Sequence, residues 1–165
     1  MIGVGNDEQI GFDIEFDDKT QAFLDWVAPE YMESKISRFL TETIPEVADY
    51  STDTWWKPPL LTRILEAAKE LFGDPDGFIA PENRDRADQF VRFLGECCIR
   101  RNPGMTWTNK PEYGTFPPLY TDFGPAVHYA DTGLTETPKS LVNWLFDDDG
   151  PKMVDYCIRT AGNPV

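Results

Sequence analysis

The sequence predicts a single, mostly helical α+β domain with a small antiparallel sheet. Apolar residues recur at spacings of three and four in several segments, which is the pattern of helices that bury one face. Two short segments between residues 105 and 130 resemble β-strands and are separated by a proline-rich loop. No internal repeat or linker divides the 165 residues, and a hydrophobic content of 41% is enough for one core. We therefore expect one domain over residues 1–165.

The first part of this domain, residues 8–44, is expected to contain one strand and two helices. Apolar and acidic residues alternate with a period of two, which indicates a half-buried strand. From Asp18 or Thr20 onward, the apolar residues have the spacing of a helix. Pro29 is placed to start a second helix, which Pro45 ends or bends. The apolar positions of the strand are Ile10, Phe12, Ile14 and Phe16.

The helical core is expected over residues 59–101. A loop at residues 49–57 precedes Pro58 and Pro59, and proline is favoured in the first turn of a helix. The clearest helical spacing of the chain follows, and Gly73 is expected to end that helix because glycine commonly terminates helices. The apolar positions of this helix are Leu60, Leu61, Ile64, Leu65, Ala68, Leu71 and Phe72.

A turn and a long helix complete the helical core. The four residues 74–77 read Asp-Pro-Asp-Gly, a sequence typical of a tight turn. Pro81 suits the first turn of a helix that continues through roughly Ile99. The apolar stripe of this helix is broad, which indicates a central helix that is covered on more than one side.

Short strands are expected between residues 105 and 130, followed by C-terminal helices over residues 137–160. The strand segments are residues 105–108 and 126–129, and an antiparallel pair is the simplest arrangement for them. Thr137 followed by Pro138 is a typical helix start. Pro151 is expected to start a last helix after the acidic turn at residues 147–150.

The negative charge of the chain is concentrated near its N-terminus. Residues 1–53 contain thirteen acidic side chains and three basic ones, within a net charge of −14. This charge disfavours nucleic acid and anionic membranes as partners, because binding to phosphates requires Lys and Arg. A protein with a basic surface is the complementary partner. Neither an export signal nor a membrane-spanning run is recognisable in the sequence, so we expect a cytoplasmic protein.

No residue pattern indicates a catalytic, metal or cofactor site, and we assign none. Cys97 and Cys98 are adjacent and lack the spacing of a redox or zinc pair, so reduced core thiols are expected. His128, the single histidine, falls in a predicted strand without a recognisable nucleophile beside it. Residues 147–150 lack the alternating ligands of a calcium loop and fit a turn between helices.

The best candidate for binding is the acidic face of the N-terminal strand and the helix after it. A solvated surface without a partner remains the alternative interpretation of this face. The tryptophans of the loop at residues 49–57 are candidate anchors, because indoles often form the centre of an interface with a charged rim. Both indoles also suit a place in the core. The candidate partner-binding residues are Asp13, Glu15, Asp17, Asp18, Asp25, Trp55 and Trp56.

Residues 85–146 carry a recognisable series of motifs. Phe-Val-Arg-Phe-Leu-Gly-Glu at residues 90–96 is followed by Gly-Met-Thr-Trp at 104–107, Pro-Pro-Leu at 117–119 and Pro-Lys-Ser-Leu-Val at 138–142. This series resembles small bacterial domains found among the immunity proteins of polymorphic toxins. The resemblance implies a helix, two strands and a closing helix, and it implies no catalytic residue.

These observations lead to one main functional hypothesis and two alternatives. The main hypothesis is a non-enzymatic, cytoplasmic immunity or inhibitor protein that neutralises a toxin domain by covering its active site. The first alternative is a small hydrolase that uses carboxylates near His128. The second alternative is an acidic mimic of nucleic acid. The sequence assigns no identity to the partner and no oligomeric state.

Overall fold

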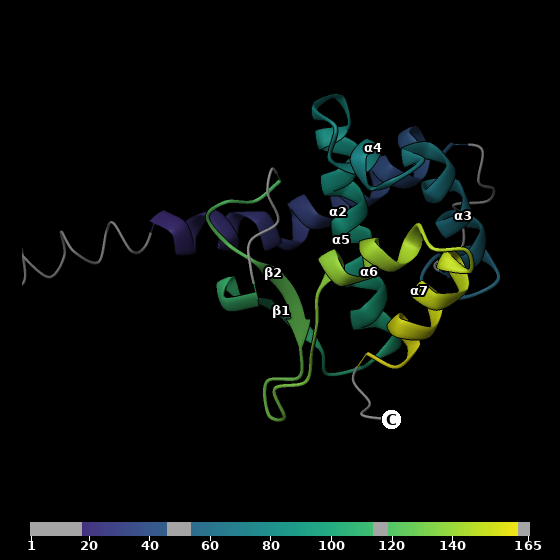
Figure 1. Cartoon of the computed structure of the whole chain (residues 1–165). Coiled ribbons are helices and arrows are strands. Elements are labelled where there is room, and N and C mark those ends of the chain that lie inside the picture. Colours follow the sequence, from purple (N-terminus) through teal and green to yellow (C-terminus); the bar gives the residue numbers. More distant parts are fainter. Residues whose placement is uncertain (1–17, 46–53, 114–118, 162–165) are drawn as a thin grey trace, which may run out of the picture.

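Helix α5 (Arg84–Arg101) runs through the middle of the molecule, and the other elements pack around it (Figure 1). The computed structural model describes residues 18–45, 54–113 and 119–161, and these form one α+β domain. Helices α2, α4, α6 and α7 and strand β2 all contact α5. Ten of the eighteen α5 residues are buried. The prediction of a central helix covered on more than one side is therefore confirmed.

Two helices and a π-helical turn form the N-terminal part of the described chain. A first helix spans residues 18–27 and is separated by Ala28 from α2 (Pro29–Arg38). Pro29 suits the start of α2 because it lacks an N–H group, which would have no partner in the first helical turn. The π-helical η1 (Phe39–Thr43) follows. The predicted helix start at Pro29 and the helical structure from Asp18 are confirmed, whereas the predicted strand, with Asp13, Glu15 and Asp17, lies outside the described residues.

Helices α3 (Leu60–Phe72) and α4 (Pro75–Ile79) lie between this N-terminal part and α5 in the sequence. Gly73 ends α3 in a left-handed conformation with φ of +80°, which glycine adopts without strain. The prediction of a simple turn at residues 74–77 is wrong. The side chain of Asp74 accepts a hydrogen bond from the Gly77 N–H at 2.7 Å and so caps α4. The 3-10 helix η2 (Pro81–Asn83) then leads into α5.

A three-stranded antiparallel sheet packs against α5 through its central strand. The strands are β1 (Thr106–Asn109), β2 (Pro125–His128) and β3 (Thr135–Glu136), in the order β1-β2-β3. Thr106 lies opposite His128, and His128 lies opposite Thr135. The predicted β1–β2 pair is confirmed. Strand β3 was not predicted because two residues are too short to show a period. The 3-10 helix η3 (Pro111–Tyr113) follows β1.

Helices α6 (Pro138–Leu145) and α7 (Gly150–Arg159) cover the other side of α5 (Figure 1). The Thr137 side chain accepts a hydrogen bond from the Ser140 N–H at 3.2 Å, which confirms the predicted start of α6. Helix α7 begins one residue before the predicted Pro151. Buried Asn102 donates hydrogen bonds to the carbonyl oxygens of Cys98 and Ile158, and thereby joins the end of α5 to α7. None of the described helices combines the length and the apolar character needed to cross a membrane.

A buried ion pair attaches the N-terminal helix to α5. The Arg92 Nε atom donates to the Asp88 Oδ2 atom at 2.8 Å, and the Arg92 side chain is only 2% exposed. The Arg92 guanidinium also donates to the Trp26 carbonyl oxygen at 2.6 Å and lies 4.3 Å from the centroid of the Trp26 ring. The pair thus joins residues of one helix to the backbone and side chain of another.

The second oxygen of Asp88 binds two further side chains. Asp88 Oδ1 accepts from the Trp26 Nε1 atom at 2.8 Å and from the Tyr120 hydroxyl. Burial, with the nearby charge of Asp88, raises the pKa of the Tyr120 hydroxyl well above its ordinary value. Tyr120 therefore stays protonated and acts as a donor near neutral pH. One carboxylate holds together the helix at residues 18–27, α5 and the segment before β2.

We expect Asp88→Ala to lower the free energy of unfolding by about 3 kcal/mol or more, because it leaves the buried Arg92 guanidinium without its counter-ion. The measurement is urea unfolding followed by circular dichroism. Asp85→Ala is the control, because Asp85 is more than half exposed and pairs with Lys35 near the surface. That variant should lose at most about 1 kcal/mol. Equal losses in the two variants would contradict a central role for the Asp88–Arg92 pair.

Glu136 on β3 gives the folded state a predictable pH dependence. Burial raises the pKa of the Glu136 carboxyl above its ordinary 4.5, and a hydrogen bond from the Thr137 N–H opposes part of that rise. The folded state therefore binds this proton more tightly than the unfolded state. Protonated Glu136 therefore contributes to the free energy of unfolding in acid. This contribution is lost as the pH rises from 4.5 through the raised pKa.

We expect Glu136→Gln to be more stable than the parent protein at neutral pH, since glutamine keeps the acceptor for Thr137 but carries no charge. The gain should be smallest near pH 4 and should grow as the pH rises above 4.5. Urea unfolding at a series of pH values measures this difference. Glu82→Gln, at an exposed position, should show no such trend. A gain that shrinks with rising pH would contradict the argument.

Candidate functional site

A groove of about 680 Å³ separates α2 and η1 from the C-terminal half of α5. Its wall on the side of α2 and η1 combines the buried apolar side chains of Met32, Ile36 and Leu40 with the polar side chains of Glu33, Ser37 and Thr41. Its opposite wall combines two indole rings with charged side chains of α5. The residues that line it include Met32, Glu33, Ile36, Ser37, Leu40, Thr41, Trp55, Glu96, Arg100 and Trp107.

Two tryptophans from different parts of the chain form the aromatic surface of the groove. Trp55 is 9% exposed, and its ring centroid lies 5.3 Å from that of Phe93 on α5. Trp107 of β1 packs against Gly95, where an added Cβ atom would lie 2.0 Å from the Trp107 Cη2 atom. The absence of a side chain at residue 95 therefore allows the indole to lie directly on α5.

Three charged side chains line the groove among the residues that the structure describes. Glu96 accepts a hydrogen bond from the Trp107 Nε1 atom at 2.7 Å through its Oε2 atom. The Arg100 guanidinium lies 4.8 Å from the centroid of the Trp55 ring, within range of a cation–π interaction. Glu33 is exposed on α2. Two carboxylates and one guanidinium leave the groove with an excess negative charge.

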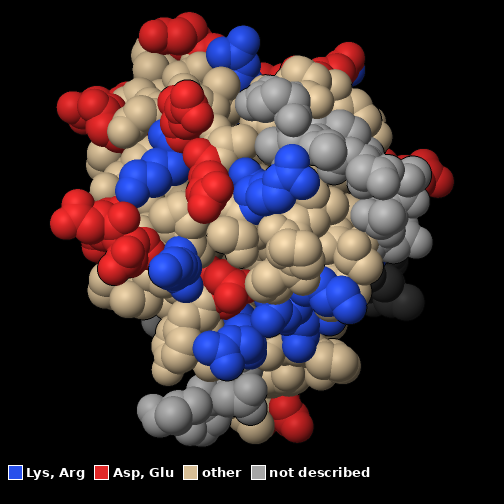
Figure 2. Space-filling view, turned by 90° about the vertical axis from the view of Figure 1, so that its right-hand side faces the viewer, with Lys and Arg blue, Asp and Glu red and all other residues tan. Residues whose placement is uncertain are grey.

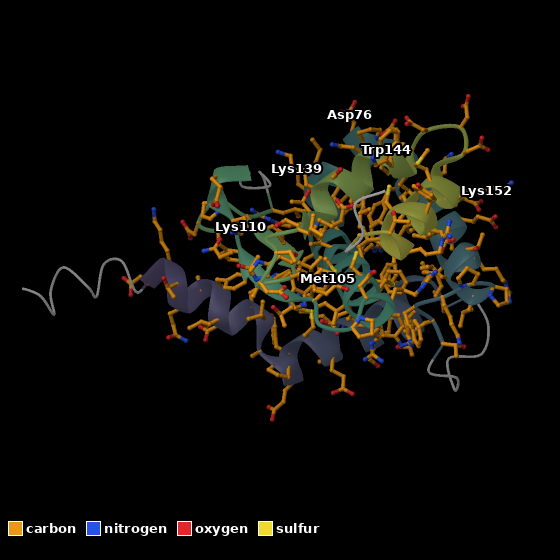
Figure 3. The ribbon with its side chains drawn as sticks, turned by 90° about the horizontal axis from the view of Figure 1, so that it is seen from below. Asp76, Met105, Lys110, Lys139, Trp144 and Lys152 are labelled. Atoms are coloured by element: carbon orange, nitrogen blue, oxygen red, sulfur yellow. The ribbon has the colours of Figure 1, made fainter. Side chains whose placement is uncertain are left out.

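Exposed acidic residues continue along the outer side of the helix at residues 18–27 and of α2. Figure 3 shows these two helices along one edge of the molecule, with side chains that point outward. Within the described part of the chain, no ion pair includes any of these acids. The basic residues of α2 are already paired, Lys35 with Asp85 and Arg38 with Glu42. The exposed acids are Asp18, Asp25, Glu30 and Glu33.

The sequence-predicted site residues are only partly brought together. Asp18 and Asp25 are exposed on one helix, as the prediction of an acidic face requires. Trp55 belongs to the core, and only its edge reaches the groove. Trp56 is half-buried, with the Lys57 Nζ atom 5.2 Å from the ring centroid. The two adjacent indoles therefore do not form one exposed anchor, because the chain turns between them and directs one ring inward.

Sequence reasoning missed the α5 and β1 residues of the groove. Glu96 and Arg100 are four residues apart and so share a helix face, which is a signal that the sequence contains. Trp107 was read only as part of a strand. Its contact with Gly95 depends on the packing of β1 against α5, which no local pattern shows.

On the side of the molecule formed by α3 and α7, acidic and basic residues occur on the same surface. Figure 2, which faces the side formed by α3 and α7, shows Lys and Arg interspersed with Asp and Glu. Eight of the thirteen acids in residues 1–53 lie outside the described residues. Exposed acids without an ion pair also occur elsewhere in the described chain, Glu66, Glu70 and Asp148 among them. Among the exposed acids of the helix at residues 18–27 and of α2, Glu33 lines the groove.

His128 and the two adjacent cysteines lie in the sheet and in the core. His128 lies in the middle strand of the sheet, between Thr106 and Thr135. Burial raises the pKa values of the Cys97 and Cys98 thiols well above the ordinary value, so both are protonated and weakly nucleophilic. Among the described residues, no group of His, Cys, Asp and Glu side chains has an arrangement that suits a metal ion.

Comparisons with known proteins add no functional assignment. No family model, curated protein or solved structure matches this chain. The resemblance of residues 85–146 to toxin-immunity domains therefore stays a prediction. In the structure these residues form most of α5, the three strands and α6.

We expect Gly95→Ala to lower the free energy of unfolding by about 1–3 kcal/mol, because the new methyl group overlaps the Trp107 ring. Urea unfolding measures the loss. In a Trp107→Leu background the overlap is removed, and the same substitution should instead stabilise α5 by up to about 1 kcal/mol, since alanine is the better helix former. If Gly95→Ala lowered the free energy of unfolding in both backgrounds, or raised it in both, the contact between Gly95 and Trp107 would be contradicted.

Proposed function

We propose that this chain is a non-enzymatic, protein-binding inhibitor, and specifically a cytoplasmic immunity protein that neutralises a toxin domain by covering its active site. The observation that carries the proposal is the groove with its aromatic surface, bordered by acidic side chains that have no cation of their own. Such an arrangement combines apolar contact area with a charged rim, which is the usual composition of a protein interface.

The partner favoured by this surface is a protein with basic side chains. The acids at Asp25, Glu30 and Glu33 are exposed, so their field reaches an approaching molecule before contact. Attraction of this kind raises the rate of association, whereas buried apolar contacts slow dissociation. A toxin that acts on nucleic acid requires a basic active site for its substrate, and an acidic inhibitor is complementary to such a site.

Binding is supported better than catalysis by the described side chains. A catalytic site needs a nucleophile or a general base within reach of a substrate pocket. His128 is not among the residues that line the described grooves, and the buried thiols of α5 are protonated. The specific assignment to immunity proteins is supported by the motif resemblance over residues 85–146.

The direct test is co-expression with the protein encoded beside this chain in its own genome. We expect that neighbour to arrest growth when expressed alone, and we expect this chain to restore growth and to co-purify with it. The control is this chain carrying Asp88→Ala, which should protect less well because the groove loses its support. A harmless neighbour, or a toxic neighbour that this chain neither binds nor neutralises, would overturn the proposal.

We also expect Asp25→Lys combined with Glu30→Lys to slow association with the neutralised partner about tenfold or more at low salt, with a smaller change in dissociation. Surface plasmon resonance at several salt concentrations measures both rates. Glu66→Lys combined with Asp76→Lys, at exposed positions of α3 and α4, changes the net charge equally. An equal effect of the two pairs would show that total charge, not the N-terminal helices, governs association.

A further inference from the structure

We propose that the groove between α2 and α5 binds a segment of a basic protein that inserts one apolar side chain and places one Lys or Arg against Glu33 and Glu96. This inference rests on the proposed function as a protein-binding module and names the chemistry of what the groove accepts. It follows from three properties of the groove, which are its apolar wall, its unused acceptors and the position of its guanidinium.

The apolar wall favours an apolar side chain of the partner. Met32, Ile36 and Leu40 lie on successive turns of α2 and η1, and all three line the groove. All three are buried in the core, with 4–6% of their surface exposed, so each presents a small, fixed apolar area to the groove. A volume of about 680 Å³ is within the range of small-ligand pockets and accommodates several side chains. Covering this wall removes apolar surface from water.

The carboxylates of the groove have acceptor capacity that the protein does not use. Glu96 accepts a hydrogen bond from Trp107 through Oε2, while its Oε1 atom has no hydrogen-bond partner among the described residues. The Glu33 carboxylate likewise has no ion-pair partner among the described residues. A carboxylate that already accepts one hydrogen bond is held in place, and its second oxygen is oriented for a charged donor.

Arg100 limits the number of cations that the groove accepts. Its guanidinium lies over the Trp55 ring and is not within 4 Å of an acidic oxygen among the described residues. A second cation at Trp55 would be repelled, and the carboxylates of Glu33 and Glu96 are the acidic acceptors that line the groove. The structure thus favours one basic residue beside an apolar residue over a run of basic residues.

Charge argues against two other occupants. A second copy of this chain carries the same net charge of −14, which opposes self-association through an acidic groove. A small anion would meet one guanidinium but two carboxylates. A basic and apolar protein segment is the occupant that matches both the wall and the charges.

Short peptides test this inference on the full chain. The probe is N-acetylated, C-amidated Ala-Leu-Lys-Leu-Ala, and the comparison peptides are Ala-Leu-Glu-Leu-Ala and Ala-Ser-Lys-Ser-Ala with the same ends. Binding is followed through the indole N–H resonances of Trp55 and Trp107 in nuclear magnetic resonance spectra. We expect saturable shifts of the Trp107 resonance with the first peptide and much weaker shifts with the other two.

Two charge-matched variants locate the binding. Glu33→Gln should weaken binding of the lysine peptide about two- to fivefold, the range of an exposed ion pair. Glu42→Gln should leave it unchanged, because Glu42 pairs with Arg38 and does not line the groove. Equal binding of the three peptides, no binding of the lysine peptide, or an equal effect of both variants would overturn the inference.

The outcome is distinguishable from failure of the proposed function. If this chain neutralises its neighbour and Glu33→Lys does not change that complex, the function stands and the groove is not the interface. If the lysine peptide binds at Trp107 while no neighbour is neutralised, the groove chemistry stands and the assignment as an immunity protein fails.

Discussion

The buried Asp88–Arg92 ion pair is the interaction on which the rest of the structure depends. A buried guanidinium is costly unless its charge and its donors are matched, and here the carboxylate, the Trp26 carbonyl and the Trp26 ring provide that match. The same carboxylate accepts from Trp26 and Tyr120. A single acidic side chain therefore fixes the relative positions of three segments that are far apart in the sequence.

The groove depends on this cluster through a short series of contacts. The Trp26 ring lies edge-on to Trp107, with 4.9 Å between the ring centroids. Trp107 lies on Gly95 and donates to Glu96, so it forms part of the groove wall and links it to the buried pair. The helix at residues 18–27 also leads directly into α2, which forms the opposite wall. Both walls of the groove are thus connected to the same buried cluster.

Charge and packing have separate roles in this protein. The exposed acids of the N-terminal helices have no cationic partner within the described residues and act at long range. On the side formed by α3 and α7, basic and acidic side chains occur on the same surface (Figure 2). Glu33, one of these acids, also lines the groove, so the exposed charge of α2 and the aromatic surface of the groove lie next to each other.

Local patterns in the sequence determined most of the helices, the β1–β2 pair and the α+β class, because helix starts, glycine ends and apolar spacing act over a few residues. Only the tertiary structure decided that Trp55 turns inward, that residues 74–77 begin α4, and that a two-residue β3 completes the sheet. It also decided that Asp88 and Arg92, four residues apart on α5, are covered by Trp26 and Tyr120. The physical reason is that burial of a polar group depends on which distant segments satisfy it, and a local period carries no information about those segments.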